Sequence, residues 1–150
     1  MNPAKWAVGP AALGPVLALS LACSGGGAKG GSAEDSGAQA SPPTFTAIYS
    51  DILSGSCAQS FCHIGPGVVM QLSDQPTAYA QLVNAPATGP YCAGMGIRVV
   101  PGHPETSLMY LKLTAHPPPC GGSMPGRPPA LTTAELQQIE QWIAMGAMND

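Results

Sequence analysis

The sequence predicts a mainly α-helical domain of three to four short helices joined by long loops. Apolar residues recur at helical spacing in several short segments, and the last of these segments carries both start and stop signals of a helix. Gly (19) and Pro (17) make up almost a quarter of the 150 residues, which keeps the helices short. Since aromatic residues are few and spread between Pro-rich loops, we expect a poor apolar core that needs a cross-link, a metal or a bound cofactor.

The first two helices are predicted around residues 44–53 and 76–83. In the first, Phe45, Ile48 and Ile52 recur at helical spacing, and Ser54-Gly55-Ser56 ends it. In the second, Pro76 suits the first turn of a helix. A small strand-like piece, Arg98 to Val100, follows in a long irregular stretch.

A third helix is predicted to begin near Pro104, with Leu108, Met109, Leu111 and Leu113 on its buried side. The prolines of residues 117–125 then require an extended loop. The last helix has the fullest set of signals: Thr132 and Glu135 form a capping box, and Gly146 closes the helix.

Residues 1–22 are predicted to be a secretory signal peptide. Lys5 precedes a mostly apolar run that ends at Ala22; this run contains prolines and is shorter than the ~20 residues that a spanning helix needs. Cys23 directly after Ala22 resembles the lipobox of bacterial lipoproteins, in which that cysteine becomes the acylated first residue. Because Ser20 stands where a lipobox usually has Leu, ordinary secretion and a retained anchor stay open as alternatives.

Residues 23–43 are predicted to be the lipidated cysteine and a flexible linker, because Gly, Ser and Ala dominate and cannot bury enough surface to fold. Export places the domain of residues 44–150 in an oxidising compartment, at the periplasmic face of the cell envelope. Ser24 follows the cysteine, in place of the Asp that often retains lipoproteins at the inner membrane, so the resemblance favours the outer membrane.

The charges exclude nucleic-acid binding. Only 9% of the residues are charged, the net charge is −3, and no basic cluster exists to neutralise phosphates. We also expect no enzyme, because helix capping and solvated surfaces explain the carboxylates.

The segment with the most specific chemistry is Cys57-Ala58-Gln59-Ser60-Phe61-Cys62-His63. Cys-x4-Cys-His is close to the Cys-x-x-Cys-His signature of c-type haem attachment. In that chemistry two thiols add to the vinyl groups at one edge of the porphyrin, and the adjacent imidazole binds the iron. A spacer of four residues requires the loop between the cysteines to bulge.

From Ile48 to Asp150 the chain resembles the small cytochrome c-like domains of exported bacterial proteins, including those called planctomycete-type cytochrome c. Four pieces match in order: the helix leading into the Cys-Cys-His segment, Val100-Pro101-Gly102-His103-Pro104-Glu105-Thr106-Ser107-Leu108, Met124-Pro125, and the last helix with Trp142-Ile143-x-x-Gly146-Ala147. This resemblance implies a small cytochrome c-like fold around a haem pocket.

The resemblance also implies the site residues. Cys57 and Cys62 would carry one haem c through thioethers, His63 would be the proximal ligand and Met124 the distal ligand. A Met opposite a His raises the haem potential and suits electron transfer. The Cys-x4-Cys spacing departs from the family pattern and bears on covalent attachment more than on the fold.

Other residues are weaker candidates for the distal position. His103 and His116 are alternative ligands, although each lies beside prolines and suits a surface position. Met109 is expected to pack in a helix, and Met70 and Met95 are loop residues without a supporting motif.

Two other interpretations of the Cys-Cys-His segment stay open. Cys57 and Cys62 could close a short disulfide loop with His63 exposed beside it. Alternatively, the three residues and another His could hold zinc or copper, against which the oxidising compartment and the lack of a second ligand pair weigh.

With Cys23 acylated, four cysteines remain, and a disulfide between Cys92 and Cys120 is expected whether the other two carry haem or form a second disulfide. Such a bridge, closing a loop of ~27 residues, would add about 3–4 kcal/mol to the free energy of unfolding in the chain-entropy model.

The function predicted from the sequence is therefore that of a membrane-tethered, monomeric c-type cytochrome that exchanges electrons with a redox partner protein in the cell envelope. The alternative is a haem-free, disulfide-stapled lipoprotein that uses a degenerate cytochrome fold as a binding or envelope module.

Overall fold

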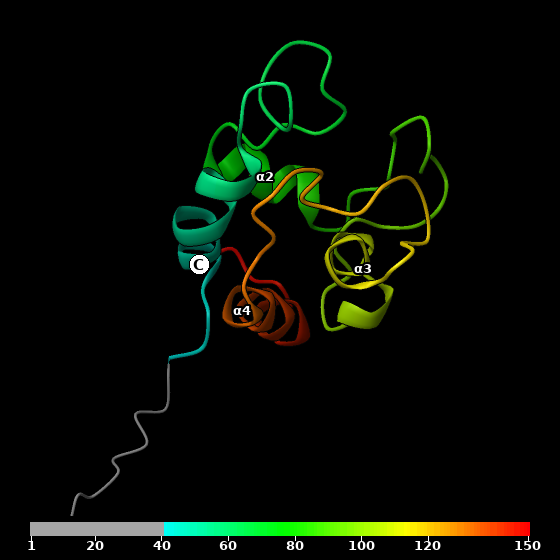
Figure 1. Cartoon of the computed structure of the whole chain (residues 1–150). Helices are drawn as coiled ribbons and strands as arrows, with labels where there is room; N and C mark the ends of the chain where they lie inside the picture. The colour runs from blue at the N-terminus through cyan, green and yellow to red at the C-terminus, as the bar shows by residue number, and fades with distance from the viewer. Residues whose placement is uncertain (1–40) are drawn as a thin grey trace, which may run out of the picture. The chain divides into compact units, whose positions relative to one another are not determined.

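A computed structural model of the chain describes residues 41–150. The predicted signal peptide, Cys23 and the predicted linker as far as residue 40 lie outside the described residues. Within residues 41–150 the elements are helices and helical turns, with isolated bridges but no strand: α1 (Phe45–Ala47), η1 (Ile48–Cys57), α2 (Gln75–Leu82), η2 (Pro104–Thr106), α3 (Leu108–Thr114) and α4 (Thr133–Ala144) (Figure 1). The predicted mainly α-helical class is confirmed.

The first helix is longer than predicted. Thr44 caps α1, since its hydroxyl accepts a hydrogen bond from the Ala47 N–H at 3.1 Å. The chain then continues without a break into η1, which has the wider hydrogen bonding of a π-helix; the Ala58 N–H donates to the Leu53 carbonyl, five residues earlier, at 2.8 Å. This extension places Cys57 at the end of the helix.

The second helix begins as predicted. Asp74 caps α2 by accepting a hydrogen bond from the Thr77 N–H at 2.9 Å, and Pro76 lies in the first turn. The strand-like piece around Val99 forms isolated bridges instead of a strand. Val99 pairs with Val83, directly after α2, and Ile97 pairs with Pro86. The segment is too short to extend into a ladder before the next turn.

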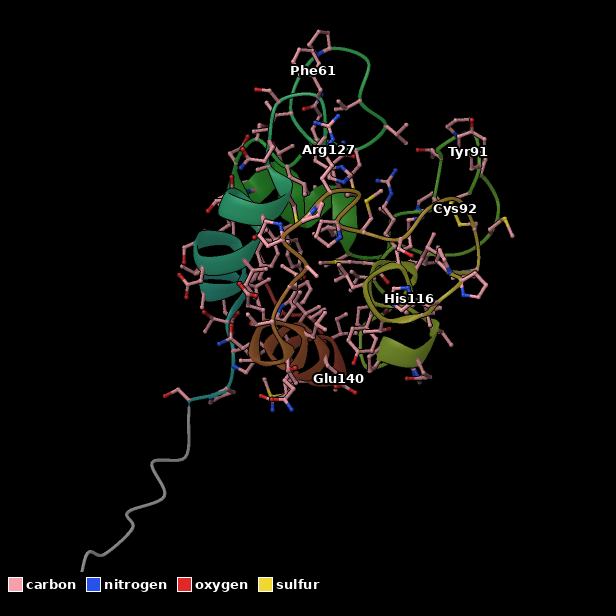
Figure 2. All side chains as sticks on the ribbon, viewed as in Figure 1. Phe61, Tyr91, Cys92, His116, Arg127 and Glu140 are labelled. Atoms are coloured by element: carbon pink, nitrogen blue, oxygen red, sulfur yellow. A yellow bond between two sulfur atoms is a disulfide. The ribbon has the colours of Figure 1, made fainter. Side chains whose placement is uncertain are left out.

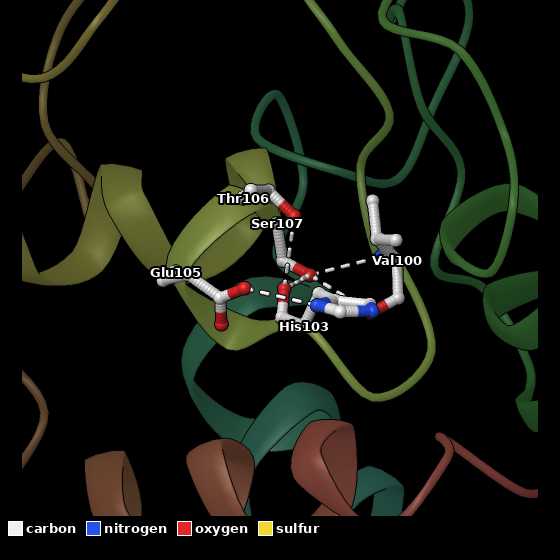
Figure 3. Close-up of polar contacts among 5 residues, drawn as sticks. All are labelled: Val100, His103, Glu105, Thr106 and Ser107. Atoms are coloured by element: carbon white, nitrogen blue, oxygen red, sulfur yellow. Dashed lines mark hydrogen bonds and ion pairs between the residues drawn. The ribbon is translucent and has the colours of Figure 1, made fainter.

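The third predicted helix is divided into two parts. Pro104–Thr106 forms a 3₁₀ turn, and α3 begins only at Leu108. Ser107, at the junction, is buried and has an extended backbone (ψ 113°). Figure 3 shows its hydroxyl between two backbone groups: it accepts from the Val100 N–H at 2.8 Å and donates to the His103 carbonyl at 2.8 Å.

Helix α4 forms with the boundaries that the sequence signals predict. The Thr132 hydroxyl accepts from the Glu135 N–H at 3.2 Å, and the Glu135 carboxylate accepts from the Thr132 N–H at 2.7 Å. Gly146 follows the helix with a φ of +105°, which favours glycine. None of the helices in residues 41–150 is long and apolar enough to cross a membrane.

The core lies between the first helix, α2 and α4. The ring of Phe45 stacks on Trp142 at a centroid distance of 5.1 Å and meets Tyr79 edge-on at 5.1 Å. The C-terminal residue closes this cluster, since the Asp150 carboxylate accepts from the Phe45 N–H at 2.9 Å. In Figure 1 the C-terminus accordingly lies beside the first helix.

The expectation of a poor core is wrong. The buried cluster comprises Phe45, Ile48, Ile52, Leu53, Leu72, Ala78, Leu82, Val99, Ile139, Trp142, Ile143 and Ala147. Three of these residues, Leu72, Val99 and Ala147, come from segments between or after the helices. A periodicity argument counts only helix faces, and therefore underestimated the core.

Candidate functional site

A largely apolar cavity of about 280 Å³ lies between the loop that follows η1, the segment of residues 87–92, helix α3 and the loop of residues 121–124. Its lining residues are Leu53, Cys57, His63, Val69, Met70, Leu72, Leu82, Ala87, Thr88, Gly89, Pro90, Tyr91, Cys92, Arg98, Leu108, Met109, Lys112, Leu113, Gly121, Gly122, Met124, Leu131 and Ile139. The volume is close to the lower end of the ~300–1,000 Å³ that is usual for ligand pockets.

A second, shallower hollow adjoins this cavity, since His63, Val69 and Met124 line both. Its other lining residues are Phe61, Cys62, Pro66, Gly67 and Val68. Figure 2 shows Phe61 at the tip of the loop that follows η1, whereas Tyr91 and Cys92 belong to the opposite wall of the cavity.

The loop after η1 fixes His63 at three points. Its N–H donates to the Gln59 carbonyl at 3.2 Å, its carbonyl accepts from the Leu72 N–H at 2.8 Å, and its Nδ1 lies 3.2 Å from the Met70 carbonyl oxygen. Because a carbonyl only accepts, Nδ1 carries the proton in this bond and Nε2 keeps its lone pair free for a metal.

The surroundings of His63 also keep it in its neutral form. Burial lowers the pKa of the imidazole, and the positive charge of Arg98 lowers it further, while the hydrogen bond to Met70 acts in the opposite direction. A neutral imidazole with one fixed N–H is the form that binds metals.

The two cysteines of the segment differ in their surroundings. Cys57 is half-buried and lines the cavity, and burial, with smaller contributions from Cys62 and Glu135, raises the pKa of its thiol to about 11. Cys62 is exposed and lines the shallow hollow. The structure therefore brings Cys57, His63 and Met124 to one cavity and places Cys62 at its outer edge.

The four-residue spacer forms the bulge that the sequence requires. The Gln59 carbonyl accepts hydrogen bonds from the N–H groups of Cys62, His63 and Ile64 at 3.0–3.2 Å. Phe61 has a left-handed backbone (φ +68°), uncommon for a residue with a side chain, and its ring is 97% exposed. The turn thus excludes Phe61 from the cavity and places His63 in the cavity wall.

The disulfide connects Cys92 and Cys120, the pair expected from the sequence, with a Cα–Cα distance of 5.4 Å. Cys57 and Cys62 are free thiols. The second disulfide, considered above for those two residues, is not formed in the structure.

Three methionines line the cavity, where the sequence singled out one. Met124 is 38% exposed, and its N–H donates to the Lys112 carbonyl at 2.8 Å. Met70 and Met109 line the same cavity, although neither has a sequence motif that favours it as a ligand.

His103 and His116 line neither hollow. His103 is exposed and its Nδ1 pairs with the Glu105 carboxylate at 3.0 Å (Figure 3). His116 is exposed beside Ser123, in the loop after α3 (Figure 2). In this structure neither is placed to be an axial ligand in the cavity.

Sequence reasoning missed two cationic residues of the cavity wall, Arg98 and Lys112. A signal for both was present. Each is a single charge within an apolar stretch, Ile97-Arg98-Val99 and Leu111-Lys112-Leu113. A segment on the surface usually contains several polar residues, so an isolated charge between apolar neighbours indicates a position near the interior.

Within residues 41–150, no group of three or more His, Cys, Asp or Glu side chains is arranged to hold a metal ion. The zinc or copper site considered from the sequence has no such group in this part of the chain. The donors of the cavity are instead one imidazole, one thiol and three thioethers set in largely apolar walls.

Comparison of the chain with protein-family models, with curated proteins and with solved structures finds no match in any of the three. A function is therefore inferred from the residues and the geometry of the cavity alone.

Proposed function

We propose that residues 44–150 form a cytochrome c-like electron-transfer domain that binds one haem c. The observation that carries the proposal is the setting of His63. Its Nδ1 is bonded to the Met70 carbonyl, which leaves Nε2 free, and its ring lines an apolar cavity together with the Cys57 thiol and the Met124 thioether.

The residues of the cavity fit such a cofactor. Cys57 and Cys62 would hold the haem covalently, His63 would be the proximal ligand and Met124 the distal ligand. When bound, the haem supplies one-electron oxidation and reduction at its iron. The ring nitrogens of the porphyrin provide the other iron ligands, so the site does not need a group of three protein ligands.

The chain itself contributes position and dielectric environment. The loop after η1 orients His63, and the apolar walls exclude water from the iron and so favour a raised potential. The shallow hollow beside Met124 and Cys62 leaves one edge of the site open to solvent, where an electron can pass to a partner. No group in this arrangement is assigned a catalytic role, and the proposal is for a carrier.

The cellular setting is part of the proposal. A signal peptide over residues 1–22, a lipid on Cys23 and a linker to residue 43 would tether the monomeric domain to the periplasmic side of the envelope, with the outer membrane favoured. The linker would let the domain reach a redox partner protein in the envelope.

The test is an absorption spectrum of the full-length protein, exported by a host with haem-attachment machinery and purified in detergent. We expect a Soret band, a sharp α-band on reduction, and a pyridine spectrum showing that the haem stays with the denatured polypeptide. The variant Cys57→Ser should lose one thioether and shift the pyridine α-band, while Met109→Leu should leave it unchanged.

The distal ligand is tested by comparing Met124→Leu with Met109→Leu. Met124→Leu should abolish the absorption band of the iron–sulfur bond in the oxidised protein and lower the potential, whereas Met109→Leu should keep the band. A colourless protein after export would overturn the proposal and leave the haem-free binding or envelope module.

A further inference from the structure

Two cations line the apolar cavity without an acidic partner. Arg98 and Lys112 belong to its wall, and none of its lining residues is acidic. Within the part of the chain that the structure describes, the one ion pair joins His103 and Glu105, outside the cavity. Both cations are half-buried and have lost part of their hydration, which an anionic ligand in the cavity would compensate.

The Arg98 guanidinium is fixed in place and still has free donors. Its Nη1 donates to the Gln81 carbonyl at 2.7 Å and to the Gln81 side-chain oxygen at 3.2 Å, and its Nη2 donates to the Thr88 hydroxyl at 2.9 Å. A guanidinium carries five N–H donors, so the bonds found among residues 41–150 leave the Nε–H and one Nη2–H for a ligand.

Lys112 is fixed beside the Cys92–Cys120 disulfide. Its Nζ donates to the Cys120 carbonyl at 2.8 Å and lies 3.9 Å from the Cys92 sulfur. Gly121 keeps this space open: its φ is +58°, and a Cβ there would lie 3.3 Å from the Lys112 Nζ. Since an ammonium has three donors, Lys112 also has capacity for a ligand.

We propose that Arg98 and Lys112 bind the carboxylates of the cavity's ligand, an apolar molecule with its acidic groups at one edge. Under the proposed function, on which this identification of the ligand rests, the carboxylates are the two propionates of the haem. Arg98 then orients the ligand relative to His63, which lines the same cavity. The same chemistry would also recognise a long-chain fatty acid.

The test uses the full chain purified without cofactor, from a host that lacks haem attachment. Binding of protoporphyrin IX and of its dimethyl ester is measured by titration, and dodecanoic acid is compared with dodecanol in the same way. The variants are Arg98→Gln, Lys112→Gln and, as a matched control, Arg127→Gln, which removes an exposed cation that does not line the cavity. Circular dichroism checks that each variant is folded. If Arg98→Gln does not fold, Lys112→Gln alone tests the inference.

We expect the porphyrin acid to bind about tenfold or more tightly than its ester, because hydrogen bonds to charged groups are the stronger ones. Arg98→Gln and Lys112→Gln should each reduce this preference, and Arg127→Gln should keep it. Equal binding of acid and ester, or an equal effect of all three variants, would overturn the inference and leave the haem proposal to its own spectral test.

The fatty-acid arm separates this inference from the proposed function. If dodecanoic acid binds with a preference that depends on Arg98 and Lys112 while no porphyrin binds, the carboxylate site stands and the haem proposal falls. If none of the four molecules binds, the inference is overturned.

Discussion

At the scale of single residues, His63 shows how a loop without regular structure can fix the position of a side chain through backbone hydrogen bonds. Its N–H, its carbonyl and its Nδ1 each have a backbone partner within residues 59–72. A side chain fixed in this way needs little rearrangement when a ligand binds, which is what makes a preorganised site effective. Loops can therefore carry the site while the helices supply the core.

The two free thiols should react at different rates. In protein purified without cofactor, we expect iodoacetamide at pH 8 to modify Cys62 quickly and Cys57 slowly. Cys62 is exposed, whereas Cys57 is half-buried and its thiol has a pKa of about 11. At pH 8 roughly one in a thousand Cys57 side chains is therefore in the reactive thiolate form. Peptide mass spectrometry over time measures both rates, and unfolding in urea should make them similar. Equal rates in the folded protein would contradict the structure.

Ser107 should contribute strongly to stability although it carries no charge. Its buried hydroxyl satisfies the Val100 N–H and the His103 carbonyl at the junction of η2 and α3 (Figure 3). We expect Ser107→Ala to lower the free energy of unfolding by about 1–3 kcal/mol, because it leaves the partly buried Val100 N–H without a partner. Urea unfolding measures the change.

The matched control is Thr106→Ala. Its exposed hydroxyl makes only a 3.4 Å contact with the His103 carbonyl, so the free energy of unfolding should change by less than about 0.5 kcal/mol. Similar losses in the two variants would show that the buried hydroxyl has no special role.

At the scale of elements, the capping box of α4 is the feature most open to a direct test. Thr132→Ala removes the hydroxyl that accepts from the Glu135 N–H, and should lower the free energy of unfolding by about 1 kcal/mol. Thr133→Ala is the control, because the hydroxyl of Thr133 makes no hydrogen bond within the described residues. If the two variants unfold at the same urea concentration, the cap does not stabilise the helix.

Elements bounded by common capping signals could be predicted from the sequence, and an element extended by a less regular side-chain contact could not. The limits of α4 are set by Thr132, Glu135 and Gly146, all within the helix or beside it. The extension of η1 to Cys57 depends instead on a contact from beyond the helix, the Gln59 side chain donating to the Gly55 carbonyl at 2.8 Å. A Ser-Gly-Ser sequence predicts a helix end, and it does not reveal that the Gln59 side chain bonds to the helix beyond this point.

Part of the candidate site could likewise be predicted from the sequence, and part could not. Cys57, Cys62 and His63 are neighbours in sequence, so a motif could identify them together. Arg98 and Lys112 are visible in the sequence as isolated charges, but their place in the cavity wall depends on how residues 87–92 and 121–124 run beside α3. Hence the sequence singled out Cys57, His63 and Met124, which line the cavity, and missed its cations.

At the scale of the whole domain, the molecule has two parts with different sources of stability. The core of Phe45, Trp142 and their neighbours is tied to the C-terminus by Asp150. The cavity wall opposite His63 has a smaller buried cluster, Ala87, Leu108 and Cys120, with Cys92 packed against it. A cluster of that size buries little apolar surface, so the covalent bond should carry more of its stability.

The disulfide should therefore have a large effect. Replacing both cysteines, with Cys92→Ser and Cys120→Ser, should lower the free energy of unfolding by about 3–4 kcal/mol, because the bridge closes a chain segment with a sequence separation of 28. The measurement is urea unfolding of protein purified without cofactor.

Cys62→Ser is the control, since it removes an exposed thiol outside the bridge and should change the free energy of unfolding by less than about 0.5 kcal/mol. A loss below about 1 kcal/mol in the double variant would mean that packing alone holds this wall. The wall carries Lys112, whose ammonium is bonded to the Cys120 carbonyl, so the double variant should also bind the acidic ligand more weakly.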